Sequence, residues 1–136
     1  MKGVYYSTPI DFTAIMDEKM AETISIDQSI RQHLFMLTIT PLGRCKFDDT
    51  FGTAVFEIDF DLPKSDNSIK EFMRKAITKS VIKYERRLLL EDIEVSVRNI
   101  DIGITGTKRV KKNVAISIRG VIIETERSFF FRVHFL

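Results

Sequence analysis

Apolar residues recur at helical spacing in the first half of the chain and alternate with polar residues in the second half. The first regular segment predicts an amphipathic helix over about residues 27–38. Ser25 and Gln28 have the spacing of a capping box at its start, Asp27 offers an alternative cap, and Pro41 lies beyond its end. The apolar stripe of this helix is formed by Ile26, Ile30, Leu34 and Leu37.

A second helix is predicted after a linker that runs from Pro63 to Ser68, with Ser68 and Glu71 as its capping box. Three lysines share a face of this helix at i, i+4 and i+8, a spacing that costs about 0.2–0.5 kcal/mol for each like-charged pair. These lysines are Lys75, Lys79 and Lys83, whereas the apolar stripe consists of Ile69, Phe72, Met73, Ala76, Ile77 and Tyr84.

The segment between the two helices fits two structures. In residues 51–62, Phe56, Ile58, Phe60 and Leu62 alternate with acidic residues, which predicts a half-buried strand. The spacing of Phe51, Val55 and Ile58 also fits a short helix. The period favours the strand.

The rest of the chain predicts three strands, because apolar and polar residues alternate there. Residues 124–127 are short enough to join the last two strands as a hairpin, and the basic tract 108–112 is interpreted as a solvated turn. Two or three helices packed on an antiparallel sheet of about three strands give an α+β fold. The apolar strand positions are Ile93, Val95, Val97, Val114, Ile116, Ile118, Phe129, Phe131, Val133 and Phe135.

Composition sets the size of the fold. The 136 residues are 44% hydrophobic and include eleven Phe, which is sufficient for one core. We expect an extended arm over residues 1–24 and a single domain over residues 25–136. No run approaches the roughly 18 apolar residues of a membrane span, and no apolar run of secretory-signal length follows the N-terminus. A cytoplasmic protein is therefore expected, and the single cysteine, Cys45, agrees with a reducing compartment.

The net charge of +2 is distributed unevenly. Residues 1–66 carry −5, residues 67–87 carry +5 and residues 88–136 carry +2. Charge alone favours a solvated basic face on the second helix, and the alternative is an acidic partner that docks there.

An ordered set of short motifs resembles the baseplate-wedge family of contractile phage tails and type VI secretion systems, where the protein is called TssE. The match covers about residues 25–135, from Ser25-Ile26-Asp27-Gln28-Ser29-Ile30 through Thr40-Pro41-Leu42-Gly43-Arg44 and Phe51-Gly52. It is strongest at Tyr84-Glu85-Arg86-Arg87-Leu88, similar to a Glu-Pro-Arg signature that ends the second helix of the family. Arg86 stands where the family has Pro, and the segment Gly43-Arg44-Cys45 lacks the family's Glu. The resemblance also favours a short helix over residues 51–60.

The resemblance implies a non-catalytic structural subunit that connects other wedge proteins to the first sheath ring. It implies no cofactor, nucleic acid, membrane insertion or small-molecule substrate. Glu85 and Arg87 would then bind neighbouring subunits, although from the residues alone an internal ion pair is the simpler interpretation. The terminal strand would lie at a sheet edge and exchange strands with the sheath protein, whereas the alternative is a covered strand. The candidate interface residues are Glu85, Arg86, Arg87, Lys75, Lys79, Lys83, Phe129, Phe131 and Val133, and the structural motif residues are Gly43, Arg44, Phe51 and Gly52.

Two other functions are weighed against this one. Phage members were long labelled lysozyme-like, and glycoside hydrolysis needs two carboxylates about 5–9.5 Å apart, one with a raised pKa. Acidic residues are plentiful, but the chain has no Trp and only three Tyr to stack on sugar rings, which disfavours an enzyme. A small regulatory adaptor of the same fold is the other alternative. His33, His134 and Cys45 lack metal-ligand spacing and are interpreted as a helix-surface residue, a strand residue and a passive thiol.

Overall fold

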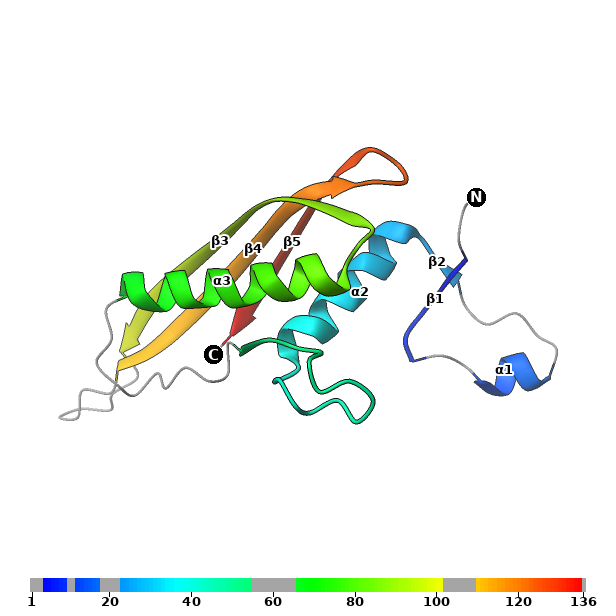
Figure 1. The fold of residues 1–136 in the computed structure, drawn as a ribbon, viewed down its shortest axis with the longest axis horizontal. Helices are drawn as coiled ribbons and strands as arrows, with labels where there is room; N and C mark the ends of the chain where they lie inside the picture. Colours follow the sequence, from blue (N-terminus) through cyan, green and yellow to red (C-terminus); the bar gives the residue numbers. More distant parts are fainter. Residues whose placement is uncertain (1–3, 10–11, 18–22, 55–65, 102–109, 136) are drawn as a thin grey trace.

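Three helices and five strands make up the part of the chain that the computed structural model describes, which is residues 4–9, 12–17, 23–54, 66–101 and 110–135 (Figure 1). The helices precede the main sheet, so the predicted α+β class is confirmed. In chain order the elements are β1 (Tyr5–Tyr6), α1 (Phe12–Met16), β2 (Thr23–Ile24), α2 (Ile26–Ile39), α3 (Asp66–Tyr84), β3 (Leu88–Asp101), β4 (Val110–Ile122) and β5 (Arg127–Phe135).

Helix α2 begins where the sequence predicts, because its capping box forms. Ser25 Oγ accepts a hydrogen bond from the backbone nitrogen of Gln28 at 3.2 Å, and Gln28 Oε1 accepts one from the backbone nitrogen of Ser25 at 3.4 Å. The predicted apolar stripe is confirmed, and its fully buried members are Ile30, Leu34 and Leu37.

Helix α3 begins at Asp66, so the predicted linker end at Ser68 and the capping box of Ser68 with Glu71 are wrong. Ser68 is the third residue of the helix, so it cannot be the N-cap. Phe72 is 40% exposed and does not belong to the buried stripe, because it lies about 100° around the helix from Met73. The buried positions recur every four residues at Ile69, Met73, Ile77 and Val81.

The main sheet is antiparallel, with the strand order β3-β4-β5. Among the described strands, β3 and β5 each pair only with β4, so both are edge strands. The predicted hairpin between β4 and β5 is confirmed, and Glu126 in its turn has a φ of 56°. The first strand begins at Leu88, five residues before the predicted alternation at Ile93. The tract 108–112 is not wholly a turn, because β4 already begins at Val110.

Both long helices cover the same face of this sheet and share one core with it. α3 lies along β3, and α2 crosses near β5 (Figure 1). The strands contribute alternate side chains, which is why Ala115 and its odd-numbered neighbours on β4 point to the other face. The buried core residues of the strands are Leu88, Ile93, Val95, Val114, Ile116, Ile118, Ile122, Phe129, Phe131 and Val133.

Two predicted segments lie outside the described residues. The alternation from Phe56 to Leu62 falls within residues 55–65, so its strand and helix alternatives stay predictions. The first two residues of the basic tract 108–112 fall within residues 102–109, so their interpretation as a turn stays a prediction. No helix of the described part of the chain combines the length and the apolar content that a membrane crossing requires.

The N-terminal region contains a small sheet of its own. β1 and β2 pair antiparallel, with Tyr5 opposite Ile24 and Tyr6 opposite Thr23. The region also contacts α2, because Thr8 Oγ1 donates to Gln32 Oε1 at 3.0 Å. The described residues before α2 are therefore connected to the main domain, and the boundary between arm and domain at residue 24 stays a prediction.

Candidate protein-interaction site

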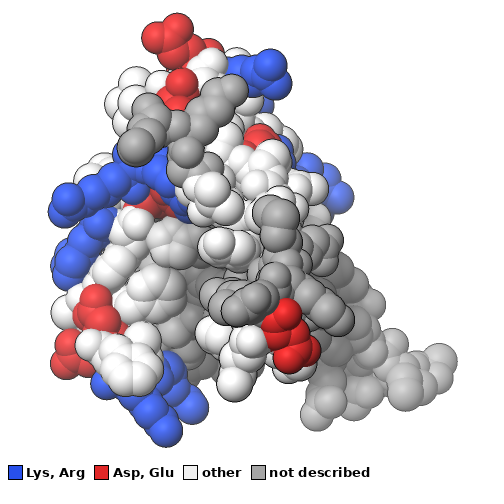
Figure 2. Space-filling model, turned by 90° about the vertical axis from the view of Figure 1, so that its right-hand side faces the viewer, with Lys and Arg blue, Asp and Glu red and all other residues white. Residues whose placement is uncertain are grey.

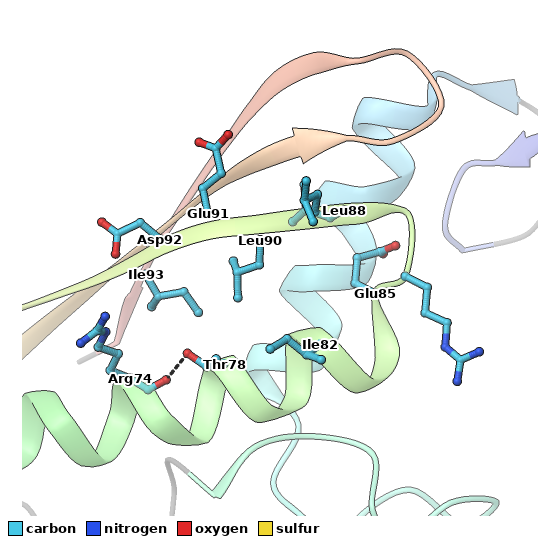
Figure 3. Close-up of a pocket in the computed structure, with 11 residues that line it drawn as sticks. Arg74, Thr78, Ile82, Glu85, Leu88, Leu90, Glu91, Asp92 and Ile93 are labelled. Carbon is cyan, nitrogen blue, oxygen red and sulfur yellow. Dashed lines mark hydrogen bonds between the residues drawn. The ribbon is translucent and has the colours of Figure 1, made fainter.

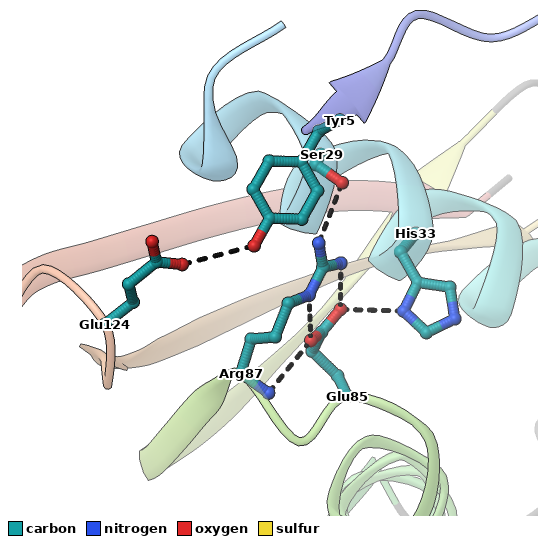
Figure 4. Close-up of polar contacts among 6 residues, drawn as sticks. All are labelled: Tyr5, Ser29, His33, Glu85, Arg87 and Glu124. Carbon is teal, nitrogen blue, oxygen red and sulfur yellow. Dashed lines mark hydrogen bonds and ion pairs between the residues drawn. The ribbon is translucent and has the colours of Figure 1, made fainter. Parts of the chain in front are cut away.

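Glu85 and Arg87 lie in the short connection between α3 and β3, where they form an ion pair with each other (Figure 4). Arg87 Nε donates to Glu85 Oε1 and Arg87 Nη2 donates to Glu85 Oε2, both at 2.9 Å. The backbone nitrogen of Arg87 also donates to Oε1, at 3.2 Å. This bidentate geometry is the strong form of an arginine–carboxylate pair. It fixes the conformation of the connection from within the chain.

Helix α2 provides the other partners of this pair. His33 Nδ1 lies 2.7 Å from Glu85 Oε2, and Ser29 Oγ accepts a hydrogen bond from Arg87 Nη1 at 2.8 Å. Ser29 and His33 are four residues apart and therefore lie on the same face of α2. The ion pair thus joins the first long helix to the end of the second.

Tyr5 extends the site to the N-terminal region. The ring centre of Tyr5 lies 5.2 Å from the guanidinium carbon of Arg87, within cation–π range. The Tyr5 hydroxyl donates to Glu124 Oε2 in the β4–β5 turn at 3.2 Å. Residues from β1, α2, the α3–β3 connection and the hairpin turn therefore meet around Arg87 (Figure 4).

The pair is enclosed to different degrees, since Glu85 is 2% exposed and the Arg87 side chain is 29% exposed. Burial alone would raise the pKa of Glu85, but the hydrogen bonds from Arg87 and His33 outweigh it and lower that pKa to about 2. The hydrogen bond to Glu85 raises the pKa of Arg87, against the effect of burial. Both groups are therefore charged at neutral pH.

Phe51 packs beside this site, and its ring contacts account for its presence in the Phe51-Gly52 motif. Its ring lies 6.0 Å from the ring of His33 and 5.1 Å, edge to face, from the ring of Tyr84. Gly52 follows with a φ of +116°, and a Cβ added there would lie 2.2 Å from the carbonyl oxygen of Thr40. Only glycine fits this approach. The Phe51-Gly52 pair is therefore structural.

The loop before Phe51 is anchored to the end of α3. Asp48 Oδ2 accepts a hydrogen bond from the Tyr84 hydroxyl at 2.9 Å, while Oδ1 accepts from the Thr50 nitrogen at 2.9 Å and from its hydroxyl at 2.6 Å. The Thr50 hydroxyl also contacts that of Tyr84. The hydrogen bonds from Thr50 and Tyr84 lower the pKa of Asp48. In the same loop, Gly43 turns the chain with a φ of +84°, and the Arg44 side chain is exposed.

The predicted basic residues have a more open setting. Lys75, Lys79 and Arg86 are exposed, whereas Lys83 donates to Thr50 Oγ1 at 2.9 Å and lies 5.2 Å from the ring centre of Tyr84. Figure 2 shows the side of the molecule on which the N-terminal region lies, and its described Lys and Arg side chains are interspersed with Asp and Glu. That face presents both signs of charge rather than one basic surface.

The predicted interface side chains of β5 face inward. Phe129, Phe131 and Val133 belong to the core, because strand alternation puts them on the side that the helices cover. Their side chains are therefore not a contact surface, which corrects that part of the prediction. The outward residues Phe130, Arg132 and His134 are exposed, and the backbone edge of β5 has no partner strand among the described residues.

The residues that contact the ion pair from β1 and α2 were not predicted, namely Tyr5, Ser29 and His33. His33 was interpreted as a surface residue, but it is half-buried against Glu85. The available signal was the pair Ser29 and His33, which share one face of the helix beside the apolar stripe of Ile30 and Leu34, where a polar partner is expected.

The acidic groups of the site are unsuited to acid catalysis. A glycosidase acid needs a raised pKa, whereas the pKa values of Glu85 and Asp48 are both lowered. Within the described residues, no group of three or more His, Cys, Asp or Glu side chains is arranged to hold a metal ion. Glu85 and Asp48 therefore lack the raised pKa that a glycosidase acid requires.

In a comparison with protein families, the model of baseplate wedge protein gp25 matches residues 24–127. A search of curated proteins gives no match. Among solved structures, the chain is similar to a protein of Geobacter sulfurreducens assigned as a tail lysozyme, with a TM-score of 0.65 and 17% identity. The similarity covers 82% of this chain and 91% of the other. At that identity it shows a shared fold.

Proposed function

Because the chain belongs to the baseplate wedge protein gp25 family, we propose that it is a non-catalytic subunit that connects baseplate wedge proteins to the first ring of a contractile sheath. The machine would assemble in the cytoplasm, as a type VI secretion system of the TssE kind or a related injection device. The observation that carries this proposal is the backbone edge of β5, which has no partner strand among the described residues. The ion-paired turn between α3 and β3 provides a second, separate contact site.

The β5 edge is suited to strand addition. An edge strand presents unpaired N–H and C=O groups, and a partner strand binds through them. Its inward side chains are already packed, so a partner would add backbone hydrogen bonds without disturbing the core. Arg31 packs over the ring of Phe129 at 4.8 Å, which ties the start of β5 to α2. A strand of the sheath protein would therefore pair with the backbone of β5.

The α3–β3 connection is suited to the wedge partners. The Glu85–Arg87 pair holds the connection in one conformation, so Glu85 positions its neighbours instead of contacting a partner. The contact surface would be the exposed Arg86, the accessible part of Arg87 and the basic stripe of Lys75, Lys79 and Lys83. Arginine there can bind partner carboxylates or carbonyl oxygens.

The sheath contact is tested by blunting the β5 edge. Lysine on an edge strand opposes strand addition, so Phe130→Lys with His134→Lys should abolish co-purification with the sheath protein while circular dichroism shows that the variant is still folded. The control, Glu94→Lys, changes the net charge by the same +2 on the outward face of β3. Full sheath binding by the β5 variant, or equal loss in the control, would refute the sheath contact.

The wedge contact is tested at Arg86. Arg86→Glu should reduce co-purification with wedge proteins at least tenfold, because it reverses a charge that lies at the surface. Unchanged co-purification would contradict the assignment. The absence of catalysis is tested on purified peptidoglycan, where we expect no turnover. Turnover that disappears on replacing one acidic residue would establish a muramidase instead.

A further inference from the structure

The main sheet has an outer face, which is the face that looks away from α2 and α3. Leu90 and Ile93 point from β3 toward α3, whereas Glu91 points away from it (Figure 3). The register of the three strands places their outward residues in rows that run across the sheet. In order from β3 through β4 to β5, the rows are Leu89, Val121 and Ser128, then Asp92, Arg119 and Phe130, then Glu94, Ser117 and Arg132, and then Ser96, Ala115 and His134.

Large apolar side chains are exposed where the outer face approaches the β4–β5 turn. Leu89 is 60% exposed and Phe130 is 46% exposed, and they belong to the first two rows. Ile123 follows at the start of the turn and is 56% exposed. Apolar side chains that gather on one exposed surface mark a protein-binding site. These three residues are called the apolar end of the outer face.

The charges of the outer face are divided between its two sides. Asp92 and Glu94 are exposed on β3, and Arg132 is exposed on β5. Arg119 belongs to the central strand, but its guanidinium carbon lies 6.0 Å from the ring centre of Phe130, so its charge lies toward β5. In the described part of the chain, none of these four charged groups forms an ion pair. The outer face therefore has an acidic side on β3 and a basic side toward β5.

A second copy of the chain complements this pattern. Rotation by half a turn about an axis in the sheet plane, parallel to the strands, places β3 of one copy over β5 of the other, row upon row. Asp92 then faces Arg119 of the second copy, and Glu94 faces Arg132 of the second copy. The two apolar ends also meet, because this rotation does not change the position along the strands. Sheets that pack face to face keep their strands within about 30° of each other, as they are here.

The other way of stacking two sheets does not match. An axis across the strands would place β3 over β3 and β5 over β5, so that like charges oppose each other. It would also place the apolar end of each copy over the far end of the other, where Ala115 and His134 lie. Arg98 lies beyond the rows that carry the two charged pairs, opposite Asn113. The pattern therefore selects the axis that runs along the strands.

We propose that the outer face joins two copies of the chain in a symmetric dimer, with the sheets face to face and the strands aligned. The apolar ends contact each other, and the charged pairs between β3 and the β5 side form on both sides of the axis. The dimer goes beyond the proposed wedge and sheath contacts, since the α3–β3 connection and the backbone edge of β5 lie outside this face.

Sedimentation equilibrium of the full chain measures the association. We expect a reversible dimer at chain concentrations below about 0.1 mM. Leu89→Asp buries a carboxylate in each copy and should weaken the dimer at least about a hundredfold. Ile82→Asp is the matched control and should leave the dimer unchanged, because Ile82 is 63% exposed but lies on α3, on the other side of the sheet. Circular dichroism shows whether both variants are folded.

The charged pairs are tested by reversal. Glu94→Arg alone and Arg132→Glu alone each create two like-charged pairs, so each should weaken the dimer about tenfold. The double variant, Glu94→Arg with Arg132→Glu, restores opposite charges between the copies and should return to within about threefold of the unchanged chain. A mixture of the two single variants should likewise form a heterodimer. Because β3 and β5 of one chain are two strand spacings apart, about 10 Å, this restoration reports on contacts between copies.

A chain that stays monomeric up to about 1 mM, a dimer that Leu89→Asp leaves intact, or a double variant that associates no more tightly than the single variants would overturn the proposal. The sheath contact is judged separately. Phe130→Lys with His134→Lys changes this face as well as the β5 edge, whereas Glu94→Arg changes this face and leaves that edge unaltered. Sheath binding that is lost in the first variant and kept in the second is therefore assigned to the edge.

Discussion

The end of α3 carries ionisable groups in two contrasting settings. Glu85 is almost fully buried, and both of its oxygens accept hydrogen bonds from Arg87, with His33 on one of them. Lys79, less than two turns earlier, is exposed to water and faces like charges at i−4 and i+4. Buried charges are costly unless they are paired, whereas exposed charges contribute little either way. The Glu85–Arg87 pair therefore stabilises the fold, whereas the exposed lysines contribute little to its stability.

The largest expected effect comes from removing the buried carboxylate. Glu85→Ala leaves the Arg87 guanidinium without its partner, and breaking a buried pair costs about 3–5 kcal/mol. Urea unfolding followed by circular dichroism would measure the loss. The matched control is Glu91→Ala, at an exposed position, where a change within about 0.5 kcal/mol is expected. A loss below about 1 kcal/mol at Glu85 would show that the pair is not coupled to folding.

Acid should produce a related loss without any mutation. The pKa of Glu85 falls from its ordinary value of 4.5 to about 2 in the folded chain, so its stabilisation is complete above about pH 5 and is lost as the pH falls toward 2. The difference corresponds to roughly 3 kcal/mol. Urea unfolding across this pH range would measure it.

Two variants separate the contributions of Glu85 and Asp48 to this loss of stability at low pH. Glu85→Gln cannot titrate, so its stability should change much less between pH 5 and pH 2. The lowered pKa of Asp48 acts in the same direction, and Asp48→Asn removes it. If Glu85→Gln loses as much stability between pH 5 and pH 2 as the unchanged chain does, then other carboxylates cause the loss.

A smaller loss is expected at the histidine that supports the pair. His33→Ala removes a hydrogen bond to a charged group, which contributes about 1.5–3 kcal/mol. His134→Ala is the matched control, because this histidine is exposed on β5. Equal effects of the two substitutions in urea unfolding would mean that the contact of His33 with Glu85 adds no stability.

Local features of the fold were predictable from the sequence, because neighbouring residues determine them. The capping box of Ser25 with Gln28 needs only a three-residue separation, and the β4–β5 hairpin needs only a short turn between two alternating runs. The start of α3 was misplaced because Ser68 also fits a cap, while the chain already becomes helical at Asp66. Capping residues identify a helix start only to within a few positions.

The site could be predicted only in part, because its partners are distant in sequence. Glu85 and Arg87 are two residues apart, and their pairing was foreseen as one alternative. His33 is 52 residues from Glu85, and no local pattern connects them. Strand alternation does place Phe129 and Phe131 on one face, but the sequence does not say which face the helices cover. That choice decides whether β5 offers a partner its side chains or its backbone.

The smallest effect is expected for the exposed lysine stripe, in contrast to the buried Glu85. Lys79→Gln relieves repulsion from Lys75 and Lys83, so it should stabilise the chain by about 0.2–0.5 kcal/mol at low salt. Salt screens exposed charges, and the gain should therefore disappear near 1 M, where the screening length is only about 3 Å. Urea unfolding at both salt concentrations would measure this, with Lys70→Gln, on the same helix, as control. A destabilisation above about 1 kcal/mol would show that Lys79 is held by partners within the fold, as Glu85 is.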